Sequence, residues 1–475
     1  MDKYKYLAKN VLLLTISNFG SKLLSFFLVP LYTSILTTEE YGTYDLMNTT
    51  ISLLIPALTV CIIEAMVRFS LDKDADHETI FSTTMYVAGK GTLIFLILVA
   101  ANKIFNIFSI INNYIAVFIA LYLIMMLFQV LQSFARGIDD VFGLAVSGIV
   151  NTVIMLTLNI VFLVYLKMGL YGYFAANLLS HAAASLYLIF RMKAWKYFKF
   201  RKISGELETE MTAYSRPLVL NSVSWWINNS ADRYIVTWLC GVSANGIYSV
   251  GYKIPSILSV IQTIFNQAWQ LSSVRVYDPD DSSGFFKNIY NVYNFILVIG
   301  CAIITVFTRF IAGFLYANDF YEAWRYVPFL TIAIVFGALS GVIGGVFQAV
   351  KDSKIQSTST AVGAVTNIVM NIVFVYIWGP IGAAAATAVS YALVWGIRLN
   401  HVRRYIHLDI KLGRDCVAYL ILVIQTALML MFGDSLILYG IQAALCIIIL
   451  LMYYSEAKEV IAKIFERLSR QKTDK

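Results

Sequence analysis

Charged residues are scarce in this chain of 475 residues, because Asp, Glu, Lys and Arg together make up only 13% of it. Soluble domains carry roughly 25% charged residues, so a water-soluble fold could not cover its surface with those present. The four histidines and five cysteines show no metal-ligand spacing, and the cysteines lie in or beside apolar runs. The composition therefore argues against a soluble enzyme, and we expect neither a metal site nor a cofactor.

Long apolar runs dominate instead, with 59% hydrophobic residues and a mean hydropathy of +0.73. A run of about 20 residues can cross a hydrocarbon core as a helix, and these runs lack the alternation of barrel strands. We predict an all-α polytopic membrane protein of about fourteen transmembrane helices. The predicted spans are 11–36, 42–66, 79–101, 112–133, 142–165, 169–190, 215–238, 244–272, 287–308, 325–350, 357–378, 380–398, 415–432 and 435–454.

The distribution of Lys and Arg gives the orientation of these spans, because cytoplasmic loops gather basic residues. With the N-terminus inside, 27 of the 36 Lys and Arg fall in cytoplasmic segments, four in outer segments, and five in or at the edge of spans. We therefore predict that both termini are cytoplasmic, in the inner membrane of a bacterium. This topology accounts for the net charge of +8, so nucleic acid is not an expected partner.

Three short matches recur in the same order along the chain, at offsets of 204 to 212 residues. Glu40–Tyr44 resembles Ala244–Tyr248, and Asn159–Phe162 recurs identically as Asn371–Phe374. The third match follows the second in each copy and is a glycine-rich helix start, at Gly169–Ala176 and Gly379–Ala386. A repeat of six spans keeps both copies in one orientation, so two pseudo-symmetric six-helix lobes should be related by an axis along the membrane normal. The predicted domains are an N-terminal lobe at 1–190, a cytoplasmic basic linker at 191–214, a C-terminal lobe at 215–398, helices 13 and 14 at 399–454 and a cytoplasmic amphipathic tail at 455–475.

The linker interleaves aromatic and basic residues over 193–202. It could be a specific headgroup or partner site, or a linker anchored on anionic membrane lipid. We favour simple anchoring.

Ionisable residues inside spans are costly and are functional candidates for that reason. Lys22, Lys90 and Lys253 lie within predicted spans, and Asp232 and Arg233 are adjacent in the seventh. The alternative for each is an internal salt bridge or a snorkelled side chain.

Basic groups outnumber acids in the predicted interior, which suits an anionic cargo such as a phosphate or diphosphate. We predict a cationic substrate-binding cavity formed by Lys22, Arg233, Lys253, Lys90 and Asn18. Asp232, Asp45 and Glu64 are predicted to balance this charge or to bind a coupling H⁺ or Na⁺. For Glu64, a pair with Arg68 one turn away is an equally good explanation.

Four segments together resemble the polysaccharide (Wzx-type) flippases of the multidrug/oligosaccharidyl-lipid/polysaccharide exporter superfamily. They are Asn18-Phe19-Gly20-Ser21-Lys22, Tyr41-Gly42-x-Tyr44-Asp45, Ala65-x-x-Arg68-Phe69 and Asp232-Arg233-Tyr234. The resemblance implies a carrier, not an enzyme, that moves undecaprenyl-diphosphate-linked oligosaccharides by alternating access for O-antigen, lipopolysaccharide or exopolysaccharide synthesis. It also implies membrane lipid and other polysaccharide assembly proteins as partners.

Three alternatives stay open at this point. A lipid II flippase of peptidoglycan synthesis also has fourteen spans, and a drug or cation antiporter of the same superfamily usually has twelve. A membrane polysaccharide polymerase or ligase would be an enzyme with a large outer loop. The longest outer loop expected here is only about Arg309–Trp324, which disfavours the enzyme.

Overall fold

Helices are the only regular elements in the residues that the computed structural model describes, which are 26–72, 74–350, 352–460 and 462. Nine helices there are long and apolar enough to cross a bilayer, or eleven if each of two bent pairs counts as one span. The predicted all-α polytopic class is confirmed. Of the other three predicted spans, 11–36 falls mostly outside the described residues, 215–238 lies in a polar helix, and 244–272 is broken.

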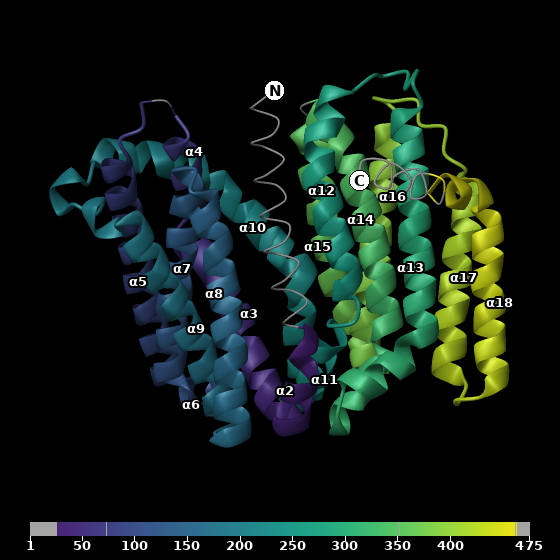
Figure 1. Cartoon of the computed structure of the whole chain (residues 1–475), viewed down its shortest axis with the longest axis horizontal. Helices are drawn as coiled ribbons and strands as arrows, with labels where there is room; N and C mark the ends of the chain where they lie inside the picture. Colours follow the sequence, from purple (N-terminus) through teal and green to yellow (C-terminus); the bar gives the residue numbers. More distant parts are fainter. Residues whose placement is uncertain (1–25, 73, 351, 461, 463–475) are drawn as a thin grey trace, which may run out of the picture. The chain divides into compact units, whose positions relative to one another are not determined.

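Two compact units divide the described residues, with the boundary between Ser230 and Ala231. In the first unit, α5, α7, α8 and α9 stand side by side (Figure 1). Its elements are α2 (Val29–Ile35), α3 (Thr38–Leu58), α4 (Ile62–Ser70), α5 (His77–Phe105), α6 (Ser109–Asn113), α7 (Ile115–Gly137), α8 (Val141–Asn159), the π-helix η1 (Ile160–Tyr165), α9 (Gly169–Met192), the short 3₁₀-helices η2 (Ala194–Lys196) and η3 (Phe200–Lys202), and the first part of α10 (Gly205–Cys240).

The second unit is built around α14, which packs against α12, α13 and α16. The hairpin of α17 and α18 lies against α13 at one edge of this unit (Figure 1). After the end of α10, the elements are α11 (Val242–Gly251), α12 (Ser256–Arg275), α13 (Phe285–Leu315), the 3₁₀-helix η4 (Asn318–Arg325), α14 (Val327–Ala349), α15 (Ser353–Trp378), α16 (Pro380–Val402), α17 (Leu412–Met431) and α18 (Leu436–Met452).

Helix starts follow from local sequence signals. Thr37 and Glu40 form a capping box at α3, in which the Thr37 hydroxyl accepts from the Glu40 amide and Glu40 accepts from the Thr37 amide. Asp76 caps α5 by accepting from the amides of Glu78 and Thr79. The turn into α16 uses Gly379 at a φ of 64° followed by Pro380, which needs no amide partner in the first helical turn.

Two predicted spans are not continuous helices. The span predicted at 42–66 is α3 and α4, bent by 60°, with Val60 and Cys61 in the left-handed region at φ values of 54° and 52°. Pro56 inside α3 cannot donate to the helical ladder, and this weakens the helix just before the break. The span predicted at 244–272 is likewise interrupted between α11 and α12, where Pro255 precedes the new helix.

The two copies of the sequence repeat have matching local geometry within their own units. Asn159 and Asn371 are both fully buried, and each amide nitrogen donates to a carbonyl one turn earlier, at 2.7 and 2.8 Å. The Asn159 amide nitrogen also donates to the Tyr32 hydroxyl of α2 at 3.5 Å, whereas the side-chain hydrogen bonds described for Asn371 stay within α15.

Small residues also match between the copies. A Cβ on Gly172 would lie 3.1 Å from the Phe162 side chain, and one on Gly382 would collide with the Phe374 carbonyl. These two phenylalanines follow Asn159 and Asn371 by three residues in each copy. The superposition of whole lobes stays a prediction.

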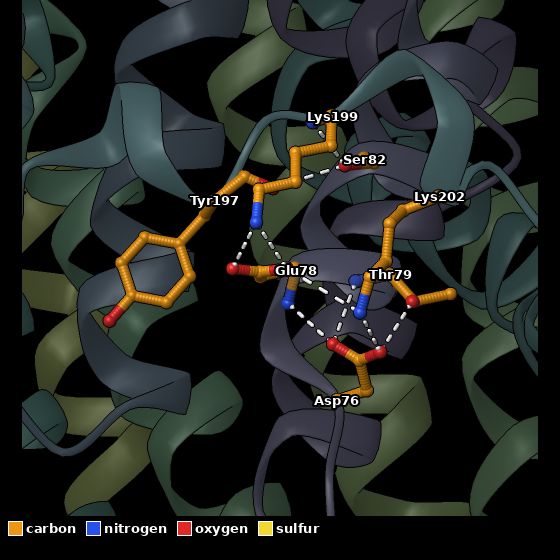
Figure 2. Close-up of polar contacts among 7 residues, drawn as sticks. All are labelled: Asp76, Glu78, Thr79, Ser82, Tyr197, Lys199 and Lys202. Carbon is orange, nitrogen blue, oxygen red and sulfur yellow. Dashed lines mark hydrogen bonds and ion pairs between the residues drawn. The ribbon is translucent and has the colours of Figure 1, made fainter.

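The basic linker is shorter than predicted and is anchored on the first unit. Arg191 belongs to α9, and 205–214 belong to α10, which leaves 193–204 as the connection. The Ser82 hydroxyl donates to the Tyr197 carbonyl at 3.0 Å and accepts from the Lys199 amide at 2.9 Å (Figure 2).

Ion pairs complete this anchor at the start of α5. The Lys199 ammonium lies 2.7 Å from Glu78, and the Lys202 ammonium lies 2.9 Å from Asp76 (Figure 2). Lys202, together with the Thr79 hydroxyl, holds the pKa of Asp76 well below its usual value. Two of the linker cations are therefore engaged by protein carboxylates. Trp195 and Phe200 stay exposed, as do the basic side chains of Lys193, Lys196 and Arg201.

Candidate functional site

Asp232 on α10 is the most enclosed acid among the predicted site residues, with 1% of its surface exposed. Its carboxylate accepts hydrogen bonds from the hydroxyls of Tyr248 at 2.7 Å and Tyr252 at 2.5 Å, and from the Arg233 amide at 2.9 Å. Tyr248 and Tyr252 are one turn apart, so both hydroxyls reach the acid from one face of the α11 segment. A carboxylate held by three donors inside an apolar unit can exchange a proton or accept a small cation.

An apolar cluster adjoins the Asp232 group and shares Tyr248 with it. Ile235 and Val236, one turn further along α10, pack with Tyr248, Leu330 and Val375. These contacts bring together α10, α11, α14 and α15, with α16 contributing Ala383 and Ala384. The site therefore lies where several helices of the second unit meet, which is where transporter bundles commonly hold ionisable groups.

Arg233 and Lys253 supply positive charge close to this acid in the sequence. The Arg233 guanidinium lies 5.3 Å from the centre of the Tyr252 ring, within the range of a cation–π contact. Lys253 follows Tyr252 directly, in the break between α11 and α12, and both basic side chains are half-buried.

Lys90 is ion-paired, which is the alternative that the sequence left open beside its substrate-binding role. Its ammonium lies 2.6 Å from Glu208 on α10 and 4.3 Å from the centre of the Tyr86 ring, and about half of the side chain is exposed. An anionic cargo would have to compete with Glu208 for this lysine. The substrate-binding role of Lys90 stays a prediction.

The remaining predicted acids lie on α3 and α4. Asp45 is half-buried on α3, whereas Glu64 is exposed on α4. Among the described residues, the Arg68 guanidinium pairs at 2.6 Å with Asp72, one turn further along the chain, and not with Glu64. Asn18 and Lys22 lie outside the described residues.

Arg398, at the end of the predicted span 380–398, was not among the predicted site residues. Helix α16 instead runs on to Val402 and buries Arg398 to 3% exposure. The guanidinium donates to neutral oxygens of Ser340 on α14 and of Gln356, Ser359 and Thr360 on α15, at 2.9 to 3.3 Å. It thereby ties three helices together. Leu399 and Val402, apolar residues that follow Arg398 on α16, are the signal that could have extended the predicted span.

No group of three or more His, Cys, Asp and Glu side chains could hold a metal ion in the described part of the chain. The partners described for Asp232 are the Tyr248 and Tyr252 hydroxyls and the Arg233 amide. The chemistry available at this site is therefore ion pairing, hydrogen bonding and proton exchange.

These observations define a class: a polytopic helical membrane protein with ionisable side chains buried inside its bundle, as in membrane transporters. A family model described as "Polysaccharide biosynthesis protein" matches residues 7–270, more than half of the chain. The chain belongs to this family. The resemblance to polysaccharide flippases that the sequence indicates is thereby confirmed.

Two curated relatives share part of the sequence. A protein of Haloferax volcanii named "Probable low-salt glycan biosynthesis flippase Agl15" is 22% identical over 203 residues, covering 42% of this chain and 43% of the relative. The "Uncharacterized membrane protein MJ1375" of Methanocaldococcus jannaschii is 26% identical over 263 residues, covering 52% of this chain and 61% of the relative. The matches thus span about half the length of these relatives.

Solved structures share the fold over nearly the whole chain. The structure titled "Lipid II flippase MurJ, inward closed conformation" has a TM-score of 0.67 and 15% identity, covering 95% of this chain and 100% of that one. An inward-facing multidrug resistance MATE family transporter of the MOP superfamily has a TM-score of 0.65 and 14% identity, covering 87% and 96%. At these identities the likeness establishes the fold alone.

Proposed function

We propose that this protein is a flippase that moves a lipid-linked oligosaccharide, carried on undecaprenyl diphosphate, across the bacterial cytoplasmic membrane for surface polysaccharide synthesis. The family match over residues 7–270 is the observation that carries this proposal. The partial relative named as a glycan biosynthesis flippase supports the same class of cargo. O-antigen and exopolysaccharide repeat units are the cargoes that the resemblance implies.

Positive charge is the requirement that such a cargo places on the protein. A diphosphate brought into a low-dielectric interior needs compensating cations, because an unpaired buried ion costs several kcal/mol even after relaxation. Lys22, Arg233 and Lys253 are the proposed diphosphate ligands, with Asn18 and Lys90 as further polar contacts. Alternating access would carry the headgroup across while the prenyl tail stays in lipid.

Acidic groups are proposed to serve the energy source of the cycle. Asp232, with Asp45 and Glu64, would bind a coupling H⁺ or Na⁺ or balance the charge of the site when no cargo is bound. Asp232 is the strongest of the three candidates, because it is enclosed and held by two tyrosine hydroxyls.

A transport assay with defined cargoes tests the proposal. The purified full chain in liposomes is given a fluorescent undecaprenyl-diphosphate-linked oligosaccharide, and a membrane-impermeant quencher reports the leaflet that holds it. Empty liposomes and Arg233→Ala are the controls. Protein-dependent movement of the oligosaccharide is expected, together with no polymer in the product.

The alternatives give different results in the same assay. Movement of lipid II but not of the oligosaccharide would make this a peptidoglycan flippase. Movement of organic cations alone would make it a drug antiporter, and polymer formation would make it an enzyme. Any of these three outcomes rejects the proposed function.

A further inference from the structure

A second buried charge cluster lies in the α17–α18 region of the second unit, away from the predicted site residues in sequence. Asp415, in the first turn of α17, has no exposed surface, and the Arg414 and Glu456 side chains are only 12% and 8% exposed. The Arg414 guanidinium lies 3.1 Å from Asp415 and 2.6 Å from Glu456. One guanidinium therefore serves two carboxylates.

The hydrogen bonds at Asp415 are unevenly shared between its two oxygens. Oδ1 accepts from the Tyr453 hydroxyl at 2.7 Å and from the Arg414 guanidinium at 3.1 and 3.2 Å. Oδ2 is buried and has no hydrogen-bond partner among the described residues. A charged carboxylate oxygen that is buried without a hydrogen-bond donor is costly, and a neutral carboxylic acid is tolerated better in the same position.

The total charge of the cluster also favours a protonated carboxyl group. Two carboxylates and one guanidinium leave one unit of negative charge in a nearly closed group. The N-terminus of α17 contributes the equivalent of roughly half a positive charge, which reduces this excess without removing it. Among the described residues, the other titratable groups that face Asp415 are the hydroxyls of Tyr453, Tyr290 on α13 and Tyr419 on α17, and these are neutral near pH 7.

We propose that Asp415 is a proton-binding site and that the Asp415–Arg414–Glu456 cluster holds one proton in the folded protein. A proton is the cation that fits, since it needs no further ligands and the described residues offer no group of three metal-ligating side chains. Proton binding at this cluster is a property of the chain itself and does not depend on the cargo.

Proton occupancy at Asp415 is connected to α13 by a short series of hydrogen bonds. The Tyr453 hydroxyl that donates to Asp415 accepts from the Asn294 amide at 3.1 Å, and the Asn294 oxygen accepts from the Tyr419 hydroxyl at 3.0 Å. Asn294 is fully buried. Binding or loss of the proton therefore changes the hydrogen bonds that join α13 to the α17–α18 hairpin.

Infrared spectroscopy of the purified full chain in lipid nanodiscs tests the proposal. At pH 7 we expect a carbonyl stretching band of a protonated carboxylic acid that is lost in Asp415→Asn. The band should persist in Asp434→Asn, which changes an exposed acid elsewhere in the second unit. In Glu456→Gln the cluster is already neutral without a bound proton, so the proton affinity of Asp415 should fall at least roughly tenfold relative to the wild type. As the pH is raised, the band of this variant should therefore vanish at a lower pH than the wild-type band.

Other outcomes overturn the proposal. A wild-type spectrum without an Asp415-dependent band does so, and so does a Glu456→Gln band that vanishes at the same pH as the wild type. A missing band together with a melting temperature that rises with NaCl but not with choline chloride would assign the site to Na⁺ instead. If Asp415→Asn fails to fold, the pH shift in Glu456→Gln still decides the question.

Discussion

Asp232 is held by hydroxyl donors, and this determines how its variants should behave. In Asp232→Asn, the amide oxygen can still accept from Tyr248 and Tyr252, so folding should be retained while transport falls to background. In Asp232→Ala, both hydroxyls lose their acceptor, which should cost about 1–3 kcal/mol of unfolding free energy. Thermal unfolding and the liposome assay measure the two effects separately.

The matched control for this acid is Asp72→Asn. Asp72 is exposed and pairs with Arg68, so both readouts should stay within error of the wild type. Full transport by Asp232→Asn would exclude a role for charge or proton exchange at this position.

Cations at the proposed diphosphate site give a second test at the residue scale. Lys22→Ala and Arg233→Ala should abolish polysaccharide export with unchanged expression and membrane insertion, because the diphosphate loses its counter-charge. Lys22→Arg should keep part of the export, since the role requires charge more than shape. Export is measured in a strain that lacks the native gene, with Lys103→Ala at an exposed helix end as control.

Normal export by both alanine variants contradicts the cationic site. The flippase proposal would then rest on the family match alone.

The sequence singled out Asp232, which is buried, but it predicted neither the exposure of Glu64 nor the burial of Arg398. Asp232 and Arg233 were found because ionisable residues inside an apolar run stand out. The tyrosine partners could not be found in this way, because they depend on the turn between α10 and α11. The pair of Lys90 and Glu208 joins residues 118 positions apart, and sequence spacing says nothing about such contacts.

At the scale of elements, the linker anchor in Figure 2 should be insensitive to pH over a wide range. The pKa of Asp76 is lowered by Lys202, so its contribution is present above about pH 4 and is lost as the pH falls further. The pKa of Lys202 is raised by Asp76, so its contribution is lost only as the pH rises beyond about 10.4. Hydrogen exchange over 193–204, corrected for the intrinsic rate, should therefore be constant between these limits.

Removing both acids of the anchor provides a direct variant test. In Asp76→Asn with Glu78→Gln, trypsin should cut after Lys199 and Lys202 several times faster than in the wild type. Asp409→Asn removes an exposed partner of Lys287 and should leave these cleavage rates unchanged. Equal rates in all three proteins would mean that the ion pairs do not hold the linker.

The α17–α18 hairpin has a second attachment to α13 through Arg309. This guanidinium is 8% exposed, lies 2.6 Å from Asp434, and donates to the carbonyls of Met429 and Phe432 at 2.6 and 2.7 Å. Arg309→Ala should lower the unfolding free energy by about 2–3 kcal/mol, because it leaves acceptors without a charged donor. Asp434→Asn should cost less than about 1 kcal/mol, since Asp434 is largely exposed.

Denaturation of both variants in the same detergent measures this difference. Equal effects would mean that the exposed ion pair, and not the buried carbonyl bonds, fastens the hairpin.

Most helix positions were predictable because long apolar runs with polar ends have few other solutions in a membrane. The predicted spans at 325–350 and 435–454 correspond to α14 and α18 with small shifts. The breaks after α3 and after α11 were not predicted, although Pro56 and Pro255 mark them. Hydropathy remains high across the first break, at Thr59–Cys61, so apolar content alone does not reveal it.

For the whole molecule, the predicted orientation can be tested by cysteine labelling. In a variant without the five native cysteines, Phe200→Cys on the linker should resist a membrane-impermeant thiol reagent in intact cells. Asp319→Cys, between α13 and α14, should react with it. Both positions are exposed, so accessibility within the protein does not explain a difference. Reaction at Phe200→Cys in intact cells would reverse the topology.

The close packing around Gly382 has a kinetic consequence for the second unit. The backbones of α15 and α16 touch there, and Arg398 joins both helices to α14 through neutral oxygens. Separating any of these helices would break several buried hydrogen bonds at once, so α14, α15 and α16 form one cooperative unit. Their amides around Gly382 and Arg398 should exchange with solvent only on global unfolding, and a transport cycle must move these three helices as one body.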